Sequence, residues 1–482
     1  MSTVNCQLSI RRSRQIPIYR TIERYRAAQG KNDHTYLAHD LAARPAGKFQ
    51  FGAPKNDTER RRAETTTHIL RTTWSPALRA KFQFSYPLFS TDSRNQTESK
   101  RENEVNILVL SCGTGGGHNS AAAAVKEELL RRGHGVVMLN PLALCGEKVA
   151  GRVDNAYISL AQRVPGAFGA VYGLGNAYRR LPWRSPVYYA NGRAAEALAA
   201  YLKEHSVDAI VTSHLFPAEI LTYLRLHGTD VPKTVFMTTD YTCIPFMEEC
   251  VCDAFVIPSG ALREDFIARG IPEDKLYPLG IPVRKSFRQK ITREQAKQAL
   301  GLDPDTRYLL VSGGSIGAGK LEKALGLLCG LTKGTDLRPI VICGNNASVL
   351  GHLEKRYGAQ AILLGRTDRM AEYMRACDLY FTKPGGLSTT EAAVMEVPLA
   401  LLPPIPGCET RNRRFFAGEG MAEAVEPTER DLERVLALLD EPDHWARMAE
   451  NQRRVIPKDA AQRICDLAAG QGPGLSRDEP GL

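Results

Sequence analysis

The sequence of 482 residues is longer than one ordinary hydrophobic core requires, so we expect two domains and additional segments. Its hydrophobic share of 43% is typical of globular proteins, and no apolar run is long enough to predict a transmembrane helix. The net charge of +10 is concentrated in residues 1–104, which hold 19 Lys and Arg against 10 Asp and Glu. The rest of the chain is therefore nearly neutral, and we expect no nucleic-acid partner.

Residues 1–104 show no regular hydrophobic period and mix arginine clusters with Asn, Thr, Ser and Pro. This composition favours a disordered extension over a basic membrane-binding arm. No methionine lies between Met1 and Met138, and Val105 directly precedes the first expected strand. We therefore also hypothesise that natural translation begins near Val105. The eleven scattered cysteines indicate reduced core thiols, no zinc site and a cytoplasmic protein.

From Asn106 onward, short apolar runs alternate with helical periods, which predicts βαβ units and parallel sheets. The first set of expected strands covers residues 106–112, 136–140, 209–212, 234–239, 254–258 and 276–283. The second set covers residues 308–312, 339–343, 361–364, 379–382 and 399–402. We therefore predict an α/β fold with doubly wound domains at 105–284 and 285–450, then a helix and tail at 451–482. Ligands of such domains bind beyond the carboxyl ends of the strands and in the cleft between domains.

A glycine-rich turn, Gly113-Thr-Gly-Gly-Gly-His118, follows the first strand. It resembles the dinucleotide fingerprint G-x-G-x-x-G, but His118 occupies the last position and Asn140 stands where an acid should follow the second strand. These departures argue against NAD. The glycines still indicate close approach of a ligand or another backbone near a helix N-terminus. His118 itself is either a catalytic residue or a helix N-cap.

A second glycine turn spans residues 312–320 and opens the second set of strands. Gly314 to Lys320 satisfies G-x-x-x-x-G-K, yet Leu321 stands where a hydroxyl would hold Mg²⁺. This departure favours a phosphate cradle over an ATPase.

A third cluster, Thr382 to Glu391, again combines a strand, a glycine turn and a helix start. Gly385 and Gly386 allow close approach of a ligand, and Ser388, Thr389 and Thr390 are suited to capping first-turn amides. Glu391 is suited to a bidentate contact with a ribose diol, and the alternative is a solvated helix glutamate.

Three stretches together resemble the lipid-glycosylating branch of the GT-B glycosyltransferases, which includes monogalactosyldiacylglycerol synthases and bacterial processive diacylglycerol glucosyltransferases. The stretches are LSCGTGGGHNSAA from residue 110, GIPVRKSF at 280–287 and TKPGGLSTTEAAVMEVPLALLPPIPGCETRNRRFF at 382–416. The likeness covers about residues 106–450 and does not reach residues 1–104. A more distant resemblance is to the enzyme that adds N-acetylglucosamine to the peptidoglycan lipid intermediate.

The resemblance implies a GT-B fold, in which two Rossmann-like domains face each other across a cleft. It also implies inverting transfer of a hexose from UDP-glucose or UDP-galactose to diacylglycerol, without a metal or cofactor. The implied donor-binding residues are Arg284, Gly313, Gly314 and Ser315 at the diphosphate, Gly385 and Gly386 at the nucleotide, Glu391 at the ribose, and Glu409 and Asn412 at the sugar. The N-terminal domain would take the lipid beside Gly116 and Gly117, with His118 nearest the acceptor oxygen.

Transfer to an alcohol requires a base, because the pKa of the hydroxyl lies far above 7. The imidazole of His118 is well matched to that task. Asp240, in TTDYTCIPFMEE, is a candidate for orienting His118 or the acceptor, although the histidine that many family members carry after this aspartate is absent. His214, in TSHLF, is a further candidate that faces the pocket, with a structural role as the alternative.

Residues 172–193 interleave aromatic and arginine side chains, a mixture that suits the headgroup layer and anionic lipids. Tyr178, Arg179, Arg180 and Trp183 are the expected contacts, and the alternative is a half-buried helix pair. We expect peripheral attachment to the inner face of the cell membrane. Three other functions stay open: a UDP-GlcNAc transferase acting on a lipid-linked cell-wall intermediate, a UDP-sugar epimerase and a non-catalytic sensor.

Overall fold

The computed structural model describes residues 104–113, 116–146, 183–313 and 321–470, with short pieces at 8–9, 47–51, 82–85, 148, 150–152, 173–175 and 178–179. The chain divides into two compact units, residues 1–99 and 100–482. In the first unit, β1 (Leu8–Ser9) pairs antiparallel with β2 (Gly47–Phe51), which pairs parallel with β3 (Phe82–Ser85). The disorder expected for residues 1–104 otherwise concerns positions outside the described residues.

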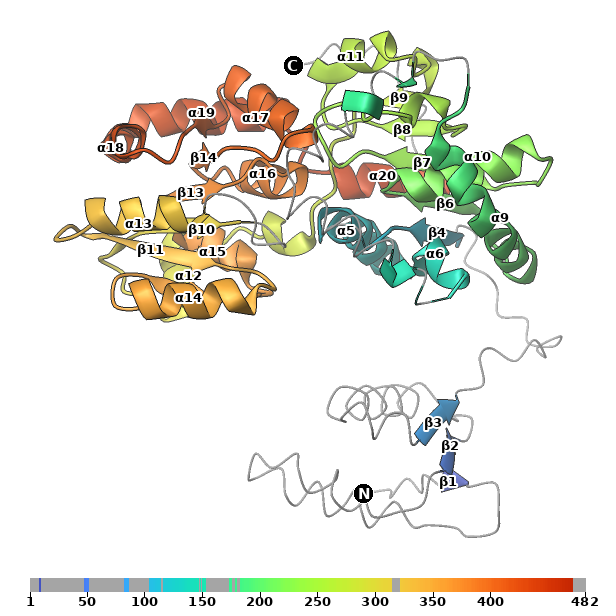
Figure 1. Ribbon diagram of the computed structural model, residues 1–482, viewed down its shortest axis with the longest axis horizontal. Coiled ribbons are helices and arrows are strands. Elements are labelled where there is room, and N and C mark those ends of the chain that lie inside the picture. The colour runs from blue at the N-terminus through green and yellow to red at the C-terminus, as the bar shows by residue number, and fades with distance from the viewer. Residues whose placement is uncertain are drawn as a thin grey trace. The chain divides into compact units, whose positions relative to one another are not determined.

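The second unit begins with a six-stranded parallel sheet ordered β5-β4-β6-β7-β8-β9 (Figure 1). Its strands are β4 (Asn106–Leu110), β5 (Gly135–Leu139), β6 (Ala209–Thr212), β7 (Lys233–Met237), β8 (Ala254–Val256) and β9 (Leu276–Tyr277). The helices are α5 (Gly116–Arg132), α6 (Pro141–Leu144), α9 (Pro186–Glu204), α10 (Leu215–Leu226) and α11 (Arg263–Ala268), with 3₁₀ turns Met247–Glu249, Gly260–Leu262 and Glu273–Lys275. The last strand is shorter than expected because Pro278 and Pro282 cannot donate to a sheet ladder.

A second six-stranded parallel sheet follows, ordered β12-β11-β10-β13-β14-β15. Its strands are β10 (Arg307–Ser312), β11 (Leu337–Ile342), β12 (Ile362–Leu364), β13 (Leu379–Thr382), β14 (Leu399–Leu401) and β15 (Glu423–Ala424). The helices are α12 (Arg293–Leu300), α13 (Leu321–Leu331), α14 (Ala347–Tyr357), α15 (Met370–Ala376), α16 (Gly386–Val394), α17 (Cys408–Gly418), α18 (Glu429–Ala437) and α19 (Pro442–Val455), with 3₁₀ turns Lys285–Arg288 and Leu438–Asp440. β15 was not predicted, because a strand of two residues is too short to show a period.

Local signals in the sequence explain where several helices begin and end. The Ser185 side chain accepts a hydrogen bond from the Tyr188 amide at 3.0 Å, and Pro186 follows as the first residue of α9. Thr292 and Gln295 form a capping box at the start of α12. Gly301 ends the same helix with a left-handed φ of 67°, a conformation that favours glycine.

The strand orders determine where ligands can bind. In each sheet the chain order reverses at one point, between β4 and β6 in the first sheet and between β10 and β13 in the second. The connections that leave the strands on either side of such a switch point run in opposite directions, and a crevice opens between them. All three glycine turns found in the sequence follow strands at these two points: β4, β10 and β13.

The last described helix, α20 (Ala460–Ala469), returns to the N-terminal domain and lies beside α5, β6 and β7 (Figure 1). Lys233 Nζ donates to the Leu467 carbonyl at 2.6 Å, and Arg132 forms an ion pair with Asp466. The end of the chain therefore contributes to the packing of the first sheet as well as to the second domain.

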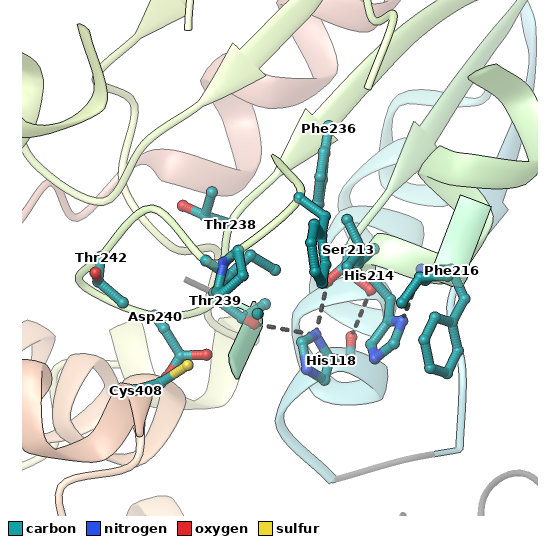
Figure 2. A pocket seen from close by; sticks show the side chains of 16 residues that line it. His118, Ser213, His214, Phe216, Phe236, Thr238, Thr239, Asp240, Thr242 and Cys408 are labelled. Atoms are coloured by element: carbon teal, nitrogen blue, oxygen red, sulfur yellow. Dashed lines mark hydrogen bonds between the residues drawn. The ribbon is translucent and has the colours of Figure 1, made fainter. Parts of the chain in front are cut away.

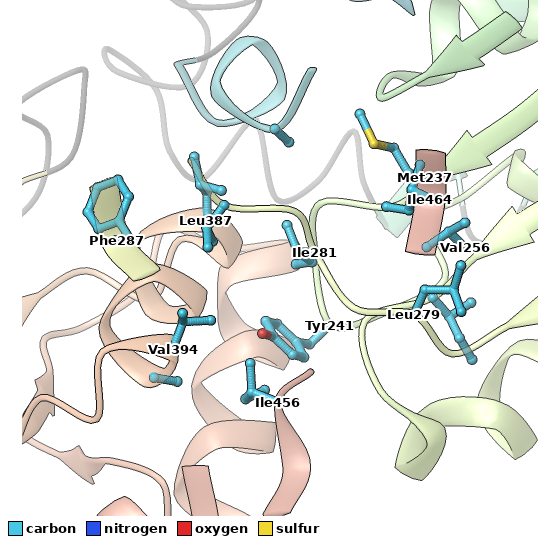
Figure 3. Packing of buried hydrophobic residues seen from close by; sticks show 14 of the residues in the cluster. Met237, Tyr241, Val256, Leu279, Ile281, Phe287, Leu387, Val394, Ile456 and Ile464 are labelled. Carbon is cyan, nitrogen blue, oxygen red and sulfur yellow. The ribbon is translucent and has the colours of Figure 1, made fainter. Parts of the chain in front are cut away.

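The largest cluster of buried apolar side chains contains residues from both domains. Figure 3 shows Tyr241 of the N-terminal domain beside Ile456, with Val394 of α16 nearby. The Tyr241 ring stacks on Phe415 with centroids 5.0 Å apart and meets Phe416 edge-on at 4.9 Å. Aromatic pairs of this kind add to the stability that area burial supplies, so the loop after β7 is firmly anchored to the C-terminal domain.

Candidate active site

A pocket of about 190 Å³ lies at the switch point of the first sheet (Figure 2). Its apolar lining is combined with a small number of polar groups, which is typical of small-molecule sites. Cys408 of the C-terminal domain completes the lining. The N-terminal residues that line it are His118, Gly175, Val187, Ser213, His214, Leu215, Phe216, Phe236, Thr238, Thr239, Asp240, Thr242, Ile244, Pro245 and Phe246.

His118 is the third residue of α5, and Nδ1 makes both hydrogen bonds of its ring that are found among the described residues. Nδ1 lies 2.7 Å from the Ser213 carbonyl oxygen and 3.0 Å from Thr239 Oγ1. Because a carbonyl oxygen only accepts, Nδ1 carries the ring proton and Nε2 keeps its lone pair. Burial lowers the pKa of His118, although the Ser213 carbonyl opposes that shift. The ring is therefore a neutral base, and its contacts do not support the N-cap interpretation.

His214 has the opposite tautomer and a structural role. It caps α10, since its Nδ1 accepts a hydrogen bond from the Phe216 amide at 3.1 Å. Its ring meets that of His118 edge-on, with centroids 4.5 Å apart. Burial, and then the neighbouring His118, lower the pKa of His214 well below its usual value. The structural interpretation of His214 is thus the one its contacts support.

Asp240 lies in the same pocket but does not orient His118. Among the described residues, Ser213 and Thr239 hold the ring, whereas Asp240 Oδ1 accepts a hydrogen bond from Asn412 Nδ2 at 2.8 Å. Burial raises the pKa of Asp240 to about 6, and the bond from Asn412 opposes this rise. Ser213 and Thr239 were not predicted as site residues, because no local pattern in the sequence marks them. A role of Asp240 toward the acceptor stays a prediction.

Two residues expected at the sugar make contacts within the protein. Asn412 is fully buried: its Oδ1 accepts from the Tyr241 amide at 2.7 Å, and its Nδ2 also donates to the Pro384 carbonyl at 3.0 Å. Glu409 pairs with Lys383 and accepts from the Ile405 amide at 2.9 Å. These contacts hold the C-terminal side of the pocket in place. Contact of either residue with sugar hydroxyls stays a prediction.

The two glycines at the start of α16 have different surroundings. A Cβ added at Gly386 would lie 1.9 Å from the Thr239 carbonyl oxygen, so this glycine allows the two domains to approach closely. A Cβ at Gly385 would meet nothing within 4 Å, which leaves open space beside it for a ligand. Across the cleft, a Cβ at Gly117 would contact Leu387 at 3.7 Å, so the first turn of α5, with Gly116 and Gly117, faces α16.

One expectation for α16 is wrong. The Thr389 hydroxyl donates to the Gly385 carbonyl at 3.0 Å, and the Thr390 hydroxyl donates to the Gly386 carbonyl at 2.6 Å. Hydroxyls in the first turns of a helix often bond back to carbonyls in this way. The hydroxyls of Thr389 and Thr390 therefore do not cap the first-turn amides, and the N-cap residue Gly385 makes no side-chain cap bond.

Glu391 is 9% exposed, so the interpretation as a solvated helix glutamate is wrong. Burial raises the pKa of Glu391 to about 8, and the charge of Arg284 opposes the rise. The linker arginine and the helix glutamate expected at the donor are thus brought near each other. Gly313 is buried at the end of β10, while Gly314, Ser315 and Lys320 lie outside the described residues.

The expected membrane contacts divide into two groups. Trp183 is 66% exposed and Tyr189 is 62% exposed. Arg179 instead forms an ion pair with Glu248 at 3.0 Å, and the Tyr178 hydroxyl donates to the Arg184 carbonyl at 3.2 Å. Arg180 lies outside the described residues. Within the described ranges, no helix is long and apolar enough to span a bilayer.

Two doubly wound domains in sequence, with glycine turns at both switch points and a pocket between them, define a GT-B protein. The solved structures agree with this fold. MurG from Acinetobacter baumannii superposes with a TM-score of 0.50 at 17% identity, covering 76% of this chain and 99% of that protein. The glycosyltransferase of kitacinnamycin superposes with a TM-score of 0.52 at 14% identity, covering 77% of this chain and 100% of that protein. The fold class predicted from the sequence is confirmed.

The family resemblance is confirmed as well. Residues 118–283 match the family described as monogalactosyldiacylglycerol (MGDG) synthase. The processive diacylglycerol beta-glucosyltransferase of Bacillus subtilis (strain 168) is 28% identical over 351 residues, covering 72% of this chain and 90% of that protein. The protein of the same name from Bacillus pumilus (strain SAFR-032) is 25% identical over 366 residues, covering 75% of this chain and 93% of that protein. The chain is thus a relative of the MGDG synthases and processive diacylglycerol glucosyltransferases.

Proposed function

We propose that this protein is an inverting glycosyltransferase that moves a hexose from a UDP-sugar to the free hydroxyl of diacylglycerol. The observation that carries the proposal is the His118 ring, a neutral imidazole with its proton held on Nδ1, in an apolar pocket next to the contact between the domains. The names of the relatives from Bacillus support the acceptor class.

In the proposed reaction, the acceptor oxygen attacks the anomeric carbon as the bond to UDP breaks, and its proton passes to His118 Nε2. The Ser213 carbonyl accepts the Nδ1 proton throughout and stabilises the imidazolium that forms. A positioned base of this kind contributes about 10²–10⁴-fold to the rate. Inversion follows because nucleophile and leaving group occupy opposite faces of the sugar.

UDP leaves with additional negative charge, which positive groups must stabilise. The amides at the start of α16 lie beside the open space at Gly385, and a helix N-terminus favours an anion. Arg284 and the Gly313 backbone, with Gly314 and Ser315, are assigned to the diphosphate, and Glu391 to the ribose hydroxyls. The proposal includes no metal ion, because these groups supply the charge that a metal otherwise provides.

The acceptor resides in a bilayer, so the proposal places the protein at the cytoplasmic face of the cell membrane as a peripheral protein. The exposed side chains of Leu174, Trp183 and Tyr189 suit the interfacial layer, and the nearby arginines suit anionic lipids. Glucose is the favoured hexose because the two Bacillus relatives described above are named as glucosyltransferases.

The test presents the protein with vesicles that contain diacylglycerol and with radiolabelled UDP-glucose or UDP-galactose, with and without EDTA. Label in the lipid phase is the expected result, with more from UDP-glucose and no loss in EDTA. Epimerised sugar nucleotide in water, or UDP-GlcNAc transfer to a polyprenyl-linked acceptor without any transfer to diacylglycerol, would contradict the proposal. UDP binding without turnover would do the same.

A further inference from the structure

We infer that Thr239 is a positioning residue that couples the position of helix α16 against the N-terminal domain to the orientation of the His118 ring. The inference rests on the proposed function for its reaction, and it concerns a residue with no assigned role in that reaction. Thr239 lies just beyond β7, is 7% exposed, and contacts both domains through different atoms.

The side chain of Thr239 acts on the base. Thr239 Oγ1 lies 3.0 Å from His118 Nδ1, and among the described residues this is the one hydrogen bond of that hydroxyl. Since Nδ1 already directs its proton to the Ser213 carbonyl, Oγ1 acts as a second acceptor for the same proton. Two acceptors on one N–H restrain rotation of the ring more than one acceptor does. They also favour the imidazolium that forms during transfer.

The backbone of Thr239 contacts the donor side. Its carbonyl oxygen lies so near Gly386 that any Cβ there would be 1.9 Å away. The next two residues are attached to the same domain: Asp240 Oδ1 accepts a hydrogen bond from Asn412 Nδ2 at 2.8 Å, and the Tyr241 hydroxyl shares a 2.6 Å hydrogen bond with Thr390 Oγ1 of α16. Residues 239–241 therefore follow α16 if that helix moves.

The same helix carries the groups assigned to the donor, Gly385 at its N-terminus and Glu391 in its second turn. A shift of α16 on nucleotide binding is transmitted through the 239–241 backbone to Thr239 Oγ1 and so to the His118 ring. Misplacement of a reacting group by about 1 Å can cost about 10²-fold in rate. The His118 ring is thus held in its reactive orientation when α16 is in contact with the loop that contains Thr239.

The first experiment compares Thr239→Val, Thr239→Ser and Thr332→Val in the vesicle assay. Valine keeps the shape of threonine and removes Oγ1, serine restores Oγ1, and Thr332 is a buried threonine of the other domain whose hydroxyl donates to the Leu328 carbonyl. We expect Thr239→Val to lower kcat about 10-fold with KM for the UDP-sugar nearly unchanged. Thr239→Ser should recover most of the loss, and Thr332→Val should match the wild type.

The second experiment measures the His118 ring directly by NMR of protein labelled with ¹⁵N-histidine, with His118→Ala for assignment. Among the described residues, the other titratable groups that line the pocket are His214 of the β6–α10 turn, whose ring meets that of His118, Asp240 after β7 and Cys408 of α17. Loss of one hydrogen-bond acceptor should lower the pKa of His118 in Thr239→Val by about half a pH unit. UDP should also shift the His118 signals in the wild type and much less in Thr239→Val.

The outcomes separate this inference from the proposed function. If the wild type forms no glycolipid, the proposed function fails whatever Thr239 does to the ring. If the wild type is active and Thr239→Val has the same kcat, the same His118 titration and the same response to UDP, the inference fails alone. Equal losses in Thr239→Ser and Thr239→Val would show a packing effect and would also overturn it.

Discussion

Asn412 Nδ2 donates to Asp240 Oδ1 at 2.8 Å, and this bond joins the two domains at the lining of the pocket. The same amide group accepts from the Tyr241 amide and donates to the Pro384 carbonyl. One buried side chain thus connects the end of the first sheet to the glycine turn of the second. A substitution here should affect the domain interface before it affects any contact with substrate.

Asn412→Ala should lower Tm, because it leaves the buried Tyr241 amide without a partner and removes a donor from Asp240. An unpaired buried group costs about 1–3 kcal/mol. Differential scanning fluorimetry is the measurement, with Asn451→Ala as the control, since Asn451 makes one bond, to the Gly420 carbonyl, at the exposed surface. Equal Tm values for the two variants would contradict the role given to Asn412.

Gly386→Ala and Gly385→Ala form a matched pair in adjacent positions. At Gly386 the new Cβ would lie 1.9 Å from the Thr239 carbonyl oxygen, so the domain contact must open, at a cost of about 1–3 kcal/mol. At Gly385 the new Cβ meets nothing within 4 Å and φ is −74°, which alanine adopts readily. Thermal unfolding should therefore show a lower Tm for Gly386→Ala alone, and a Tm equal to the wild type would refute the close approach.

His118→Ala should reduce glycolipid formation by about 10²–10⁴-fold, because the acceptor proton loses its base. UDP binding by isothermal titration calorimetry should change little, since the ring bonds to Ser213 and Thr239 of its own domain and not to the groups assigned to the donor. Turnover at the wild-type rate would end the assignment of His118 as the base.

The buried carboxyl of Glu219 should make the folding stability of the protein fall as the pH rises. Burial, and then the charge of Glu249, raise the pKa of Glu219 to about 9 from a usual value near 4.5. The folded state therefore holds a proton that the unfolded state releases between pH 4.5 and 9, and stability falls across that window. Glu219→Gln should match the wild type in Tm near pH 4.5 and exceed it by an increasing margin toward pH 9.

Glu128 provides the control of opposite sign. Arg131 is the main cause that lowers the pKa of Glu128 to about 2, and burial opposes it. Above pH 4.5 the Glu128 carboxyl is ionised in both the folded and the unfolded state, so its contribution to folding stability no longer changes with pH. Glu128→Gln should therefore reduce Tm equally at pH 5 and pH 9. A Glu219→Gln difference that does not vary with pH would contradict the assignment of a buried, protonated carboxyl.

Much of the fold could be predicted because parallel strands buried on both faces produce apolar runs that are visible locally, such as residues 106–112. The observed strands agree with the predicted runs to within a few residues in both sheets, apart from the early end of β9 and the two-residue β15. The prolines after β9 hold an extended segment outside the ladder, and a two-residue strand has no period to detect.

The candidate site was predicted only in part. Gly113 to His118 and Gly385 to Glu391 are contiguous motifs, so their chemistry is visible in the sequence. The residues that contact those motifs in the folded protein are not visible in the sequence. Ser213 lies 95 positions from His118, and Thr239 lies 121 positions from it, and both are common residue types without a signature. The hydroxyls of Thr389 and Thr390, which donate to helix carbonyls instead of accepting from amides, could not be predicted either. Threonine is common in both arrangements, so the residue type does not distinguish them.

By itself, the sequence determined the two doubly wound domains, the three glycine turns and the residue types available for acid–base and anion-binding chemistry, because periodicity and turn chemistry are properties of neighbouring residues. Tertiary structure alone decided which His118 nitrogen holds the proton, that Gly386 serves the domain contact, and that Asn412 bridges the domains. These relations join positions 95 to 172 residues apart. They arise only when both sheets have formed and their switch points have met.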